Sequence, residues 1–176
     1  MALYGSSVEY GLHCLLYLSE NADAVPPSCK DLAEYQGISP TYVAKLFTKL
    51  EKAGLVVSAE GVRGGFRLAQ PKRDISVLQV VDALEGGQPL FKCREIRGNC
   101  ILYEGNPPDR VTSSVCRIHA LMLEAELKMR GVLAARSLDE LDKSVGEVMP
   151  AETKQATRDW FAARAQTRAP ARRTGV

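Results

Sequence analysis

Residues 39–54 read SPTYVAKLFTKLEKAG, which is the pattern of a helix buried on one side. Ser39 followed by Pro40 favours a helix start, because a hydroxyl side chain can cap the helix and proline suits its first position. Gly54 is typical of the residue that ends a helix. The apolar residues have the i, i+3, i+4, i+7 spacing of a buried face: Val43, Leu46, Phe47 and Leu50. The opposite face carries polar residues, at Thr41, Lys45, Thr48 and Lys52, with Tyr42 beside its N-terminal end.

Two further helices are predicted before this one. Residues 7–20 carry an apolar stripe at helical spacing. A Pro-Pro pair then breaks the pattern, and Ser28 can cap a short helix over residues 29–36 that Gly37 ends. Only a short glycine turn separates this helix from residues 39–54, so the pair is typical of a helix-turn-helix.

A hairpin is predicted directly after the helix pair. Residues 55–58 and 66–69 have strand-like composition, and residues 60–65 between them form a turn rich in glycine. Arg63 lies at the tip, beside Gly64 and Gly65. A helix-turn-helix followed by a hairpin with a basic tip predicts a winged helix-turn-helix. Ser76 caps one more predicted helix, which ends at Gly86 and Gly87.

Residues 88–115 show no periodicity, and this stretch is too long for a plain connector. Periodicity returns at Cys116, with an a/d seam at Ile118, Met122, Ala125, Met129 and Val132. We interpret the seam as a helix that packs against its twin in a homodimer; packing on its own domain is the alternative. The expected fold is mostly α, with four segments. They are a winged helix-turn-helix DNA-binding domain (1–86), a cysteine-bearing sensor loop (87–115), a dimerisation helix with a short following helix (116–149) and a basic, disordered tail (150–176), in which a helix containing Trp160 and Phe161 is possible.

Charge is distributed unevenly along the chain, although the net charge is only +2. Residues 41–73 carry seven basic and two acidic side chains, and such a basic segment in a near-neutral protein favours a nucleic-acid partner. Ser39 and Thr41 could donate hydrogen bonds to phosphates or bases, and Tyr42 could contact phosphate or a thymine methyl group. Lys45 could reach phosphate or guanine. At the hairpin, Arg63 is placed to enter a minor groove, and Gly64 and Gly65 let the backbone approach; a hairpin that merely carries an arginine is the alternative.

Composition excludes several classes of protein. The chain has 176 residues, of which 45% are apolar, and no apolar run has the length of a membrane span. The N-terminal residues lack the features of a signal peptide, so we expect a cytoplasmic protein and no membrane partner. An enzyme is disfavoured, because the sequence shows neither a phosphate loop nor a nucleophile–base arrangement.

Five cysteines without an export signal indicate a reducing compartment rather than a disulfide framework. Cys93, Cys100 and Cys116 lie in or beside the irregular stretch, and His119 shares a helix face with Cys116 if a helix starts there. Three thiolates and an imidazole suit an iron–sulfur cluster or zinc, although the spacing matches no common zinc finger. Any one of these cysteines could instead be an inert core residue. We interpret Cys14 and Cys29, which lie in the first two predicted helices, as packing residues, and Glu9 as a surface or capping carboxylate.

These motifs together identify a resemblance. VEYGLHCLLYL at residues 8–18, GISPTYVAKLF at 37–47, RGGFRLA at 63–69 and the three-cysteine loop resemble the Rrf-two (Rrf2) family of bacterial winged helix-turn-helix transcriptional regulators, over residues 1–145. The resemblance implies a homodimer that binds a pseudo-palindromic DNA operator. It also implies that Cys93, Cys100 and Cys116 are cluster ligands, with His119 as the fourth and Glu9 as a less favoured ligand from the opposite subunit. The sequence departs from the family in the long segment between Cys100 and Cys116.

The sequence therefore predicts a DNA-binding transcriptional regulator that is controlled by an iron–sulfur cluster. A 2Fe-2S cluster is favoured and a 4Fe-4S cluster is possible. The cluster would sense cluster supply, redox state or nitric oxide. Two alternatives stay open: a cluster-free regulator switched by thiol oxidation or zinc, and a protein-interaction module that regulates a partner enzyme.

Overall fold

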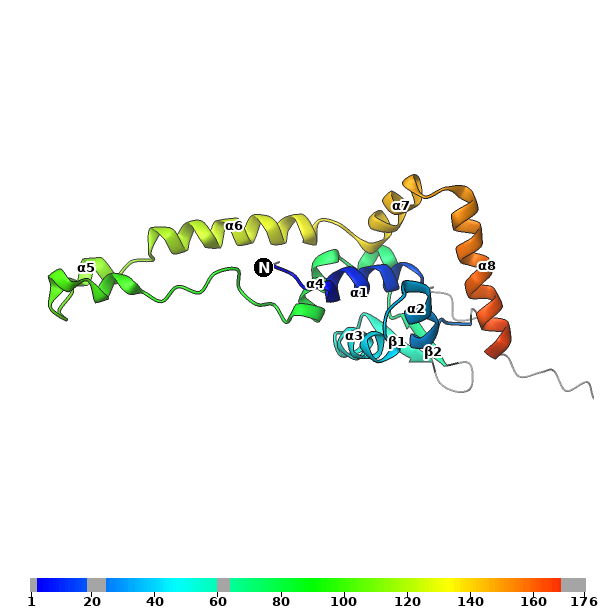
Figure 1. Ribbon diagram of the computed structural model, residues 1–176. Coiled ribbons are helices and arrows are strands. Elements are labelled where there is room, and N and C mark those ends of the chain that lie inside the picture. The colour runs from blue at the N-terminus through cyan, green and yellow to red at the C-terminus, as the bar shows by residue number, and fades with distance from the viewer. Residues whose placement is uncertain (1–2, 19–24, 60–63, 169–176) are drawn as a thin grey trace, which may run out of the picture. The chain divides into compact units, whose positions relative to one another are not determined.

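The computed structural model describes residues 3–18, 25–59 and 64–168, and its contacts divide the chain into two compact units (Figure 1). The first unit comprises residues 1–87 and 134–176, and the second comprises residues 88–133. Helices dominate both units, and a two-stranded sheet lies in the first. The described helices include none with both the length and the hydropathy needed to cross a bilayer.

The core of the first unit forms between its helices and the base of the hairpin. These helices are α1 (Ser6–Leu16), α2 (Cys29–Gln36), α3 (Pro40–Lys52), the short 3-10 helix η1 (Lys72–Asp74) and α4 (Val77–Glu85). The four apolar residues predicted for the inner face of α3 are all buried. Full burial of side chains of this size stabilises the folded state by roughly 1.5–3 kcal/mol each, so α3 is firmly held with its polar face outward.

The turn between α2 and α3 follows from local chemistry. Ser28 accepts a hydrogen bond from the Asp31 backbone N–H (3.2 Å) while the Asp31 carboxylate accepts one from the Ser28 N–H (2.8 Å), which is a capping box. Gly37 ends α2 with φ of 67°, a left-handed conformation that glycine adopts without steric cost. Ser39 precedes α3, but its side chain makes no cap hydrogen bond, so the prediction of a hydroxyl cap there is wrong. Pro40 is at the predicted position.

The predicted hairpin is present. Strand β1 (Val56–Ala59) pairs antiparallel with β2 (Gly65–Leu68), and Val56 lies opposite Leu68. Both of these residues are buried, and the Phe66 ring packs on Phe47 of α3 at 4.7 Å between centroids. We call residues 56–68 the wing. Its tip residues 60–63, and therefore Arg63, lie outside the described residues.

The C-terminal part of the first unit differs from the predicted boundaries. Helix α7 (Leu138–Val148) belongs to this unit rather than to the dimerisation segment, because Leu138 is fully buried and its N–H donates to the Ile75 carbonyl (2.8 Å). Residues 151–168, predicted as part of a disordered tail, form helix α8 (Ala151–Arg168). The physical reason is an aromatic cluster, since Phe161 packs on Tyr17 (5.3 Å) and Tyr35 (5.0 Å). The rest of the predicted tail, residues 169–176, lies outside the described residues.

The second unit contains short turns and one long helix. The turns are η2 (Ile96–Asn99), η3 (Ile101–Tyr103) and α5 (Asp109–Thr112), and they lie in the segment predicted to be irregular. The long helix α6 (Arg117–Ala134) begins directly after Cys116, as predicted. None of its residues is buried within the described chain. Apolar side chains are therefore left exposed along it, including Ile118, Leu121, Leu127 and Val132.

Candidate nucleic-acid interface and cysteine pocket

Helix α3 presents a polar surface to solvent. Ser39, Thr41 and Lys45 are exposed, and Thr48 and Lys52 continue the same face. Because the Ser39 hydroxyl is not used as a cap, it is available to an external acceptor. Hydroxyl and ammonium groups at the N-terminal half of a helix are the donors that contact phosphates and base edges in the major groove.

Tyr42 occupies a different position from its neighbours on α3. Its side chain is half-buried, and its ring meets Tyr10 of α1 edge to face at 6.0 Å. Its hydroxyl lies 3.5 Å from the Ser6 hydroxyl. Packing of the ring fixes the direction of the Tyr42 hydroxyl, which lies at the junction of α1 and α3.

The base of the wing is held against the segment before α2. The Phe66 N–H donates to the Pro27 carbonyl at 3.0 Å. A Cβ at Gly65 would collide with the carbonyl oxygens of Pro26 and Pro27. The sequence suggested that Gly65 lets the backbone approach DNA. The structure shows that a side chain here would also collide with the segment before α2.

Some of the basic residues in 41–73 make contacts within the protein, and two of them contact residues distant in the sequence. Lys49 donates to the Leu84 carbonyl (2.5 Å) at the end of α4, where a helix favours positive charge. Lys72 donates to the Leu16 carbonyl (2.9 Å) and pairs with Asp142 (2.7 Å). Local charge counting missed these structural roles, because their partners are distant in the sequence.

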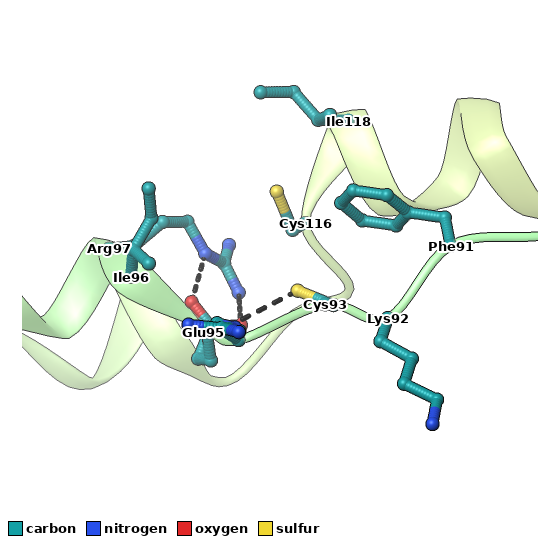
Figure 2. A pocket seen from close by; sticks show the side chains of 9 residues that line it. Phe91, Lys92, Cys93, Glu95, Ile96, Arg97, Cys116 and Ile118 are labelled. Atoms are coloured by element: carbon teal, nitrogen blue, oxygen red, sulfur yellow. Dashed lines mark hydrogen bonds and ion pairs between the residues drawn. The ribbon is translucent and has the colours of Figure 1, made fainter. Parts of the chain in front are cut away.

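In the second unit, Cys93 and Cys116 line one pocket of about 320 Å³ (Figure 2). Both residues are half-buried and neither forms a disulfide, and the Cys93 sulfur accepts a hydrogen bond from the Glu95 N–H (3.4 Å). The pocket is also lined by the apolar residues Phe91, Ile96 and Ile118, by the ion pair of Arg97 with Glu95, and by Lys92 and Arg94. Two of the three predicted cysteine ligands are thus brought together.

Arg97 organises the turn beside the two thiols, and sequence reasoning did not identify it. Its guanidinium binds Glu95 through two bonds (2.5 and 2.7 Å) and donates to the Ser114 carbonyl (2.7 Å). Glu95 has φ of 48°, which is unfavourable for a residue with a side chain. The hydrogen bond to Arg97 lowers the pKa of Glu95. The pKa of Arg97 is raised, chiefly by its hydrogen bond to Glu95 and further by Cys116 and Cys93.

The other predicted ligands, Cys100, His119 and Glu9, do not line this pocket. Cys100 is exposed between η2 and η3, and His119, in the first turn of α6, packs its ring 6.0 Å from Phe91. Glu9 is exposed in the first turn of α1. Across residues 3–18, 25–59 and 64–168, no three His, Cys, Asp or Glu side chains are placed to hold a metal ion. The donor types nevertheless fit a cluster, since thiolates are the usual ligands of iron–sulfur centres and imidazole can replace them.

Cys14 and Cys29 are set apart from this pocket. Cys14 is fully buried in the core of the first unit, and Cys29 is half-buried at the start of α2. Burial raises the pKa of Cys14 to about 12, with a further contribution from Cys29, and raises that of Cys29 to about 11. Both are packing residues, as their positions in the sequence predicted.

The sequence and the fold are both similar to those of known transcriptional regulators. The Rrf2 family model, described as an iron-dependent transcriptional regulator, matches residues 4–144. The transcriptional regulator IscR of Salmonella agona is 32% identical over 164 residues, which is 93% of this chain and 92% of IscR. Among solved structures, IscR of T. potens has a TM-score of 0.62 at 25% identity, covering 85% of this chain and 93% of that one. The global cysteine regulator CymR of B. subtilis has a TM-score of 0.61 at 22% identity, covering 82% and 98%, and shares the fold. The chain belongs to the Rrf2 family and is a transcriptional regulator rather than an enzyme.

Proposed function

We propose that two copies of this chain bind a pseudo-palindromic DNA operator, each inserting α3 into the major groove while its wing contacts the adjacent minor groove. The observation that carries this proposal is the construction of α3: a fully buried apolar face fixes the helix, and Ser39, Thr41 and Lys45 are exposed on the other side. Gly64 and Gly65 in the wing and Arg63 at its tip complete the proposed surface, with Tyr42 at its edge.

A dimer supplies the second recognition helix. The apolar side chains along α6 are exposed in a single chain, and a twin helix would bury them. Recognition helices that enter successive major grooves must lie about 34 Å apart. The packing of α6 against its twin would therefore set the distance between the two recognition helices, and with it the affinity of the dimer for DNA.

We propose further that Cys93, Cys100 and Cys116, with His119, hold an iron–sulfur cluster in the second unit, with 2Fe-2S favoured over 4Fe-4S. Glu9 of the opposite subunit is a less favoured ligand. Support comes from the shared pocket of Cys93 and Cys116 and from the cation Arg97 beside it. When bound, such a cluster supplies a redox-active and labile centre. Two of these ligands, Cys116 and His119, lie at the start of α6, so their arrangement would affect the helix that pairs the two subunits.

A second candidate is a thiol switch without a cluster. It is favoured by one observation: the pocket gathers Cys93 and Cys116, while Cys100 does not line it. In that case an oxidant would join the two thiols as a disulfide, releasing two electrons and two protons to it. Iron and sulfide content distinguishes the two candidates.

The DNA proposal is tested by selecting ligands from a randomised duplex library with the wild-type protein. We expect an enriched sequence with two related half-sites, and binding that weakens steeply with salt because phosphate contacts release counterions. If the protein enriches no sequence, and if its residual binding has a salt slope near zero, the proposed DNA-binding function is wrong.

The cluster proposal is tested by visible absorbance, iron and acid-labile sulfide on protein purified without oxygen. We expect coloured protein with matched iron and sulfide. Colourless protein that cannot be reconstituted would exclude the cluster and leave the thiol switch as the sensing function.

A further inference from the structure

Arg168, at the end of α8, bridges the wing and α2. Its Nη1 donates to the Gly64 carbonyl (2.9 Å), and its Nη2 donates to the Pro26 carbonyl (2.9 Å). The same Nη2 lies 3.0 Å from Asp31 Oδ2. One guanidinium therefore joins the wing at the residue before β2, the segment before α2, and α2 itself.

The carboxylate in this bridge is buried. The Asp31 side chain is 7% exposed and that of Arg168 is 20% exposed. Asp31 also accepts from the backbone N–H and the hydroxyl of Ser28, each at 2.8 Å. A buried carboxylate that loses its cation is left uncompensated, which is strongly unfavourable. Arg168 thus supports both the cap of α2 and the attachment of the wing.

Side-chain contacts between α8 and α2 hold Arg168 in place. Tyr35 of α2 meets Trp160 and Phe161 at 5.2 and 5.0 Å, and its hydroxyl lies 2.6 Å from the Thr157 hydroxyl. Arg164 pairs with Glu34 and stacks over Trp160 at 4.9 Å. The family model matches only as far as residue 144, so this support is supplied by residues that the family model does not cover.

We propose that Arg168 is a positioning residue for DNA binding: α8 uses it to fix the wing relative to the helix-turn-helix. This inference rests on the proposed role of the wing in contacting DNA. Arginine suits the task because its planar fork can reach two carbonyl oxygens and a carboxylate together, whereas lysine presents a single point charge. Because the wing is already fixed, α3 and the wing can contact DNA together without the entropy cost of ordering the wing on binding.

The test compares Arg168→Ala and Arg168→Lys with Arg158→Ala. Arg158 is an exposed residue of the same helix whose side chain bonds to Gln155, so its removal changes the net charge equally. Binding is measured by fluorescence anisotropy on the duplex that the wild-type protein selects from the random library. Amide hydrogen exchange is followed at Phe66, whose N–H donates to Pro27. Fluorescence of Trp160, the single tryptophan, reports whether α8 stays docked.

We expect Arg168→Ala to weaken binding about tenfold, in keeping with the loss of hydrogen bonds to a charged group, and to speed exchange at Phe66. Arg158→Ala should change neither. If Arg168→Ala equals Arg158→Ala in both measurements, the proposal is overturned while the DNA-binding function stands. If the wild-type protein selects no duplex, it is the proposed function that fails. Should Arg168→Ala not fold, Arg168→Lys decides: faster exchange at Phe66 supports the bridge, and unchanged exchange overturns it.

Discussion

At the scale of single residues, Lys45 offers the most direct test of the recognition surface. Lys45→Ala removes an exposed cation from the outer face of α3 without touching the buried face. We expect about 1–3 kcal/mol weaker binding to the selected duplex and a salt slope smaller by about 1. Lys143→Ala is the matched control, because Lys143 is an exposed lysine on α7 that pairs with Asp139. Equal affinities for the two variants would show that Lys45 does not face the DNA.

Gly65 gives a prediction about stability. Gly65→Ala would place a Cβ against the carbonyl oxygens of Pro26 and Pro27, and the backbone must shift to relieve the collision. We expect the free energy of unfolding to fall by about 1–3 kcal/mol, the usual cost of overpacking, as measured by urea denaturation. Gly146→Ala, where a Cβ would meet nothing within 4 Å, is the control. Wild-type stability in Gly65→Ala would mean that the wing base is not held as the structure has it.

The cysteines should differ in reactivity in the cluster-free protein. Cys100 is exposed, whereas Cys14 is buried and its pKa is raised to about 12. The thiolate is the reactive form, and at pH 8 almost all of Cys14 is protonated. We expect iodoacetamide to label Cys100 first and Cys14 last, as followed by peptide mass spectrometry. Rapid labelling of Cys14 in folded protein would contradict its place in the core.

Element by element, sequence reasoning succeeded where the structure is determined locally. The capping residues Ser28 and Ser76 and the glycine at Gly37 locate the helix ends from a few neighbouring residues. The spacing of Val43, Leu46, Phe47 and Leu50 identifies the buried side of α3 because helical periodicity is itself local. The same reasoning applies to the hairpin.

Sequence reasoning failed where long-range contacts decide. The sequence indicated only a possible helix containing Trp160 and Phe161, because α8 is held by contacts of Phe161 with Tyr17 and Tyr35, more than a hundred residues away. Arg97 binds Ser114, and Arg168 binds Gly64 and Asp31. No rule of sequence spacing predicts these contacts. Similarly, Cys93 and Cys116 share a pocket, but the spacing of the cysteines alone did not separate them from Cys100.

Helix α6 carries a prediction about assembly. Met122 and Val132 belong to the predicted seam, and Val132 is 66% exposed in a single chain. Val132→Lys would place a charge where a twin helix is proposed to pack, which is unfavourable without a partner. We expect sedimentation equilibrium to show a dimer for the wild type and a shift toward monomer for Val132→Lys. Lys128→Ala, on an exposed lysine paired with Glu124, should remain a dimer; a dimer of unchanged stability in Val132→Lys would show that the subunits pair elsewhere.

For the whole molecule, the central claim is that the cysteine-bearing unit controls the affinity of the DNA-binding unit. Two sites that both bias one equilibrium are linked by a coupling free energy, typically about 1–3 kcal/mol. Here the proposed link is α6 (Arg117–Ala134), which directly follows Cys116. Three residues beyond its end, Ser137 forms an isolated β-bridge with Ser76 of the first unit.

The most direct measurement is the affinity of anaerobically purified wild-type protein for its selected duplex, compared with that of the variant in which Cys93, Cys100 and Cys116 are all alanine. We expect the two affinities to differ about 5- to 150-fold while both proteins remain folded dimers. Equal affinities would contradict control of DNA binding by the cysteines.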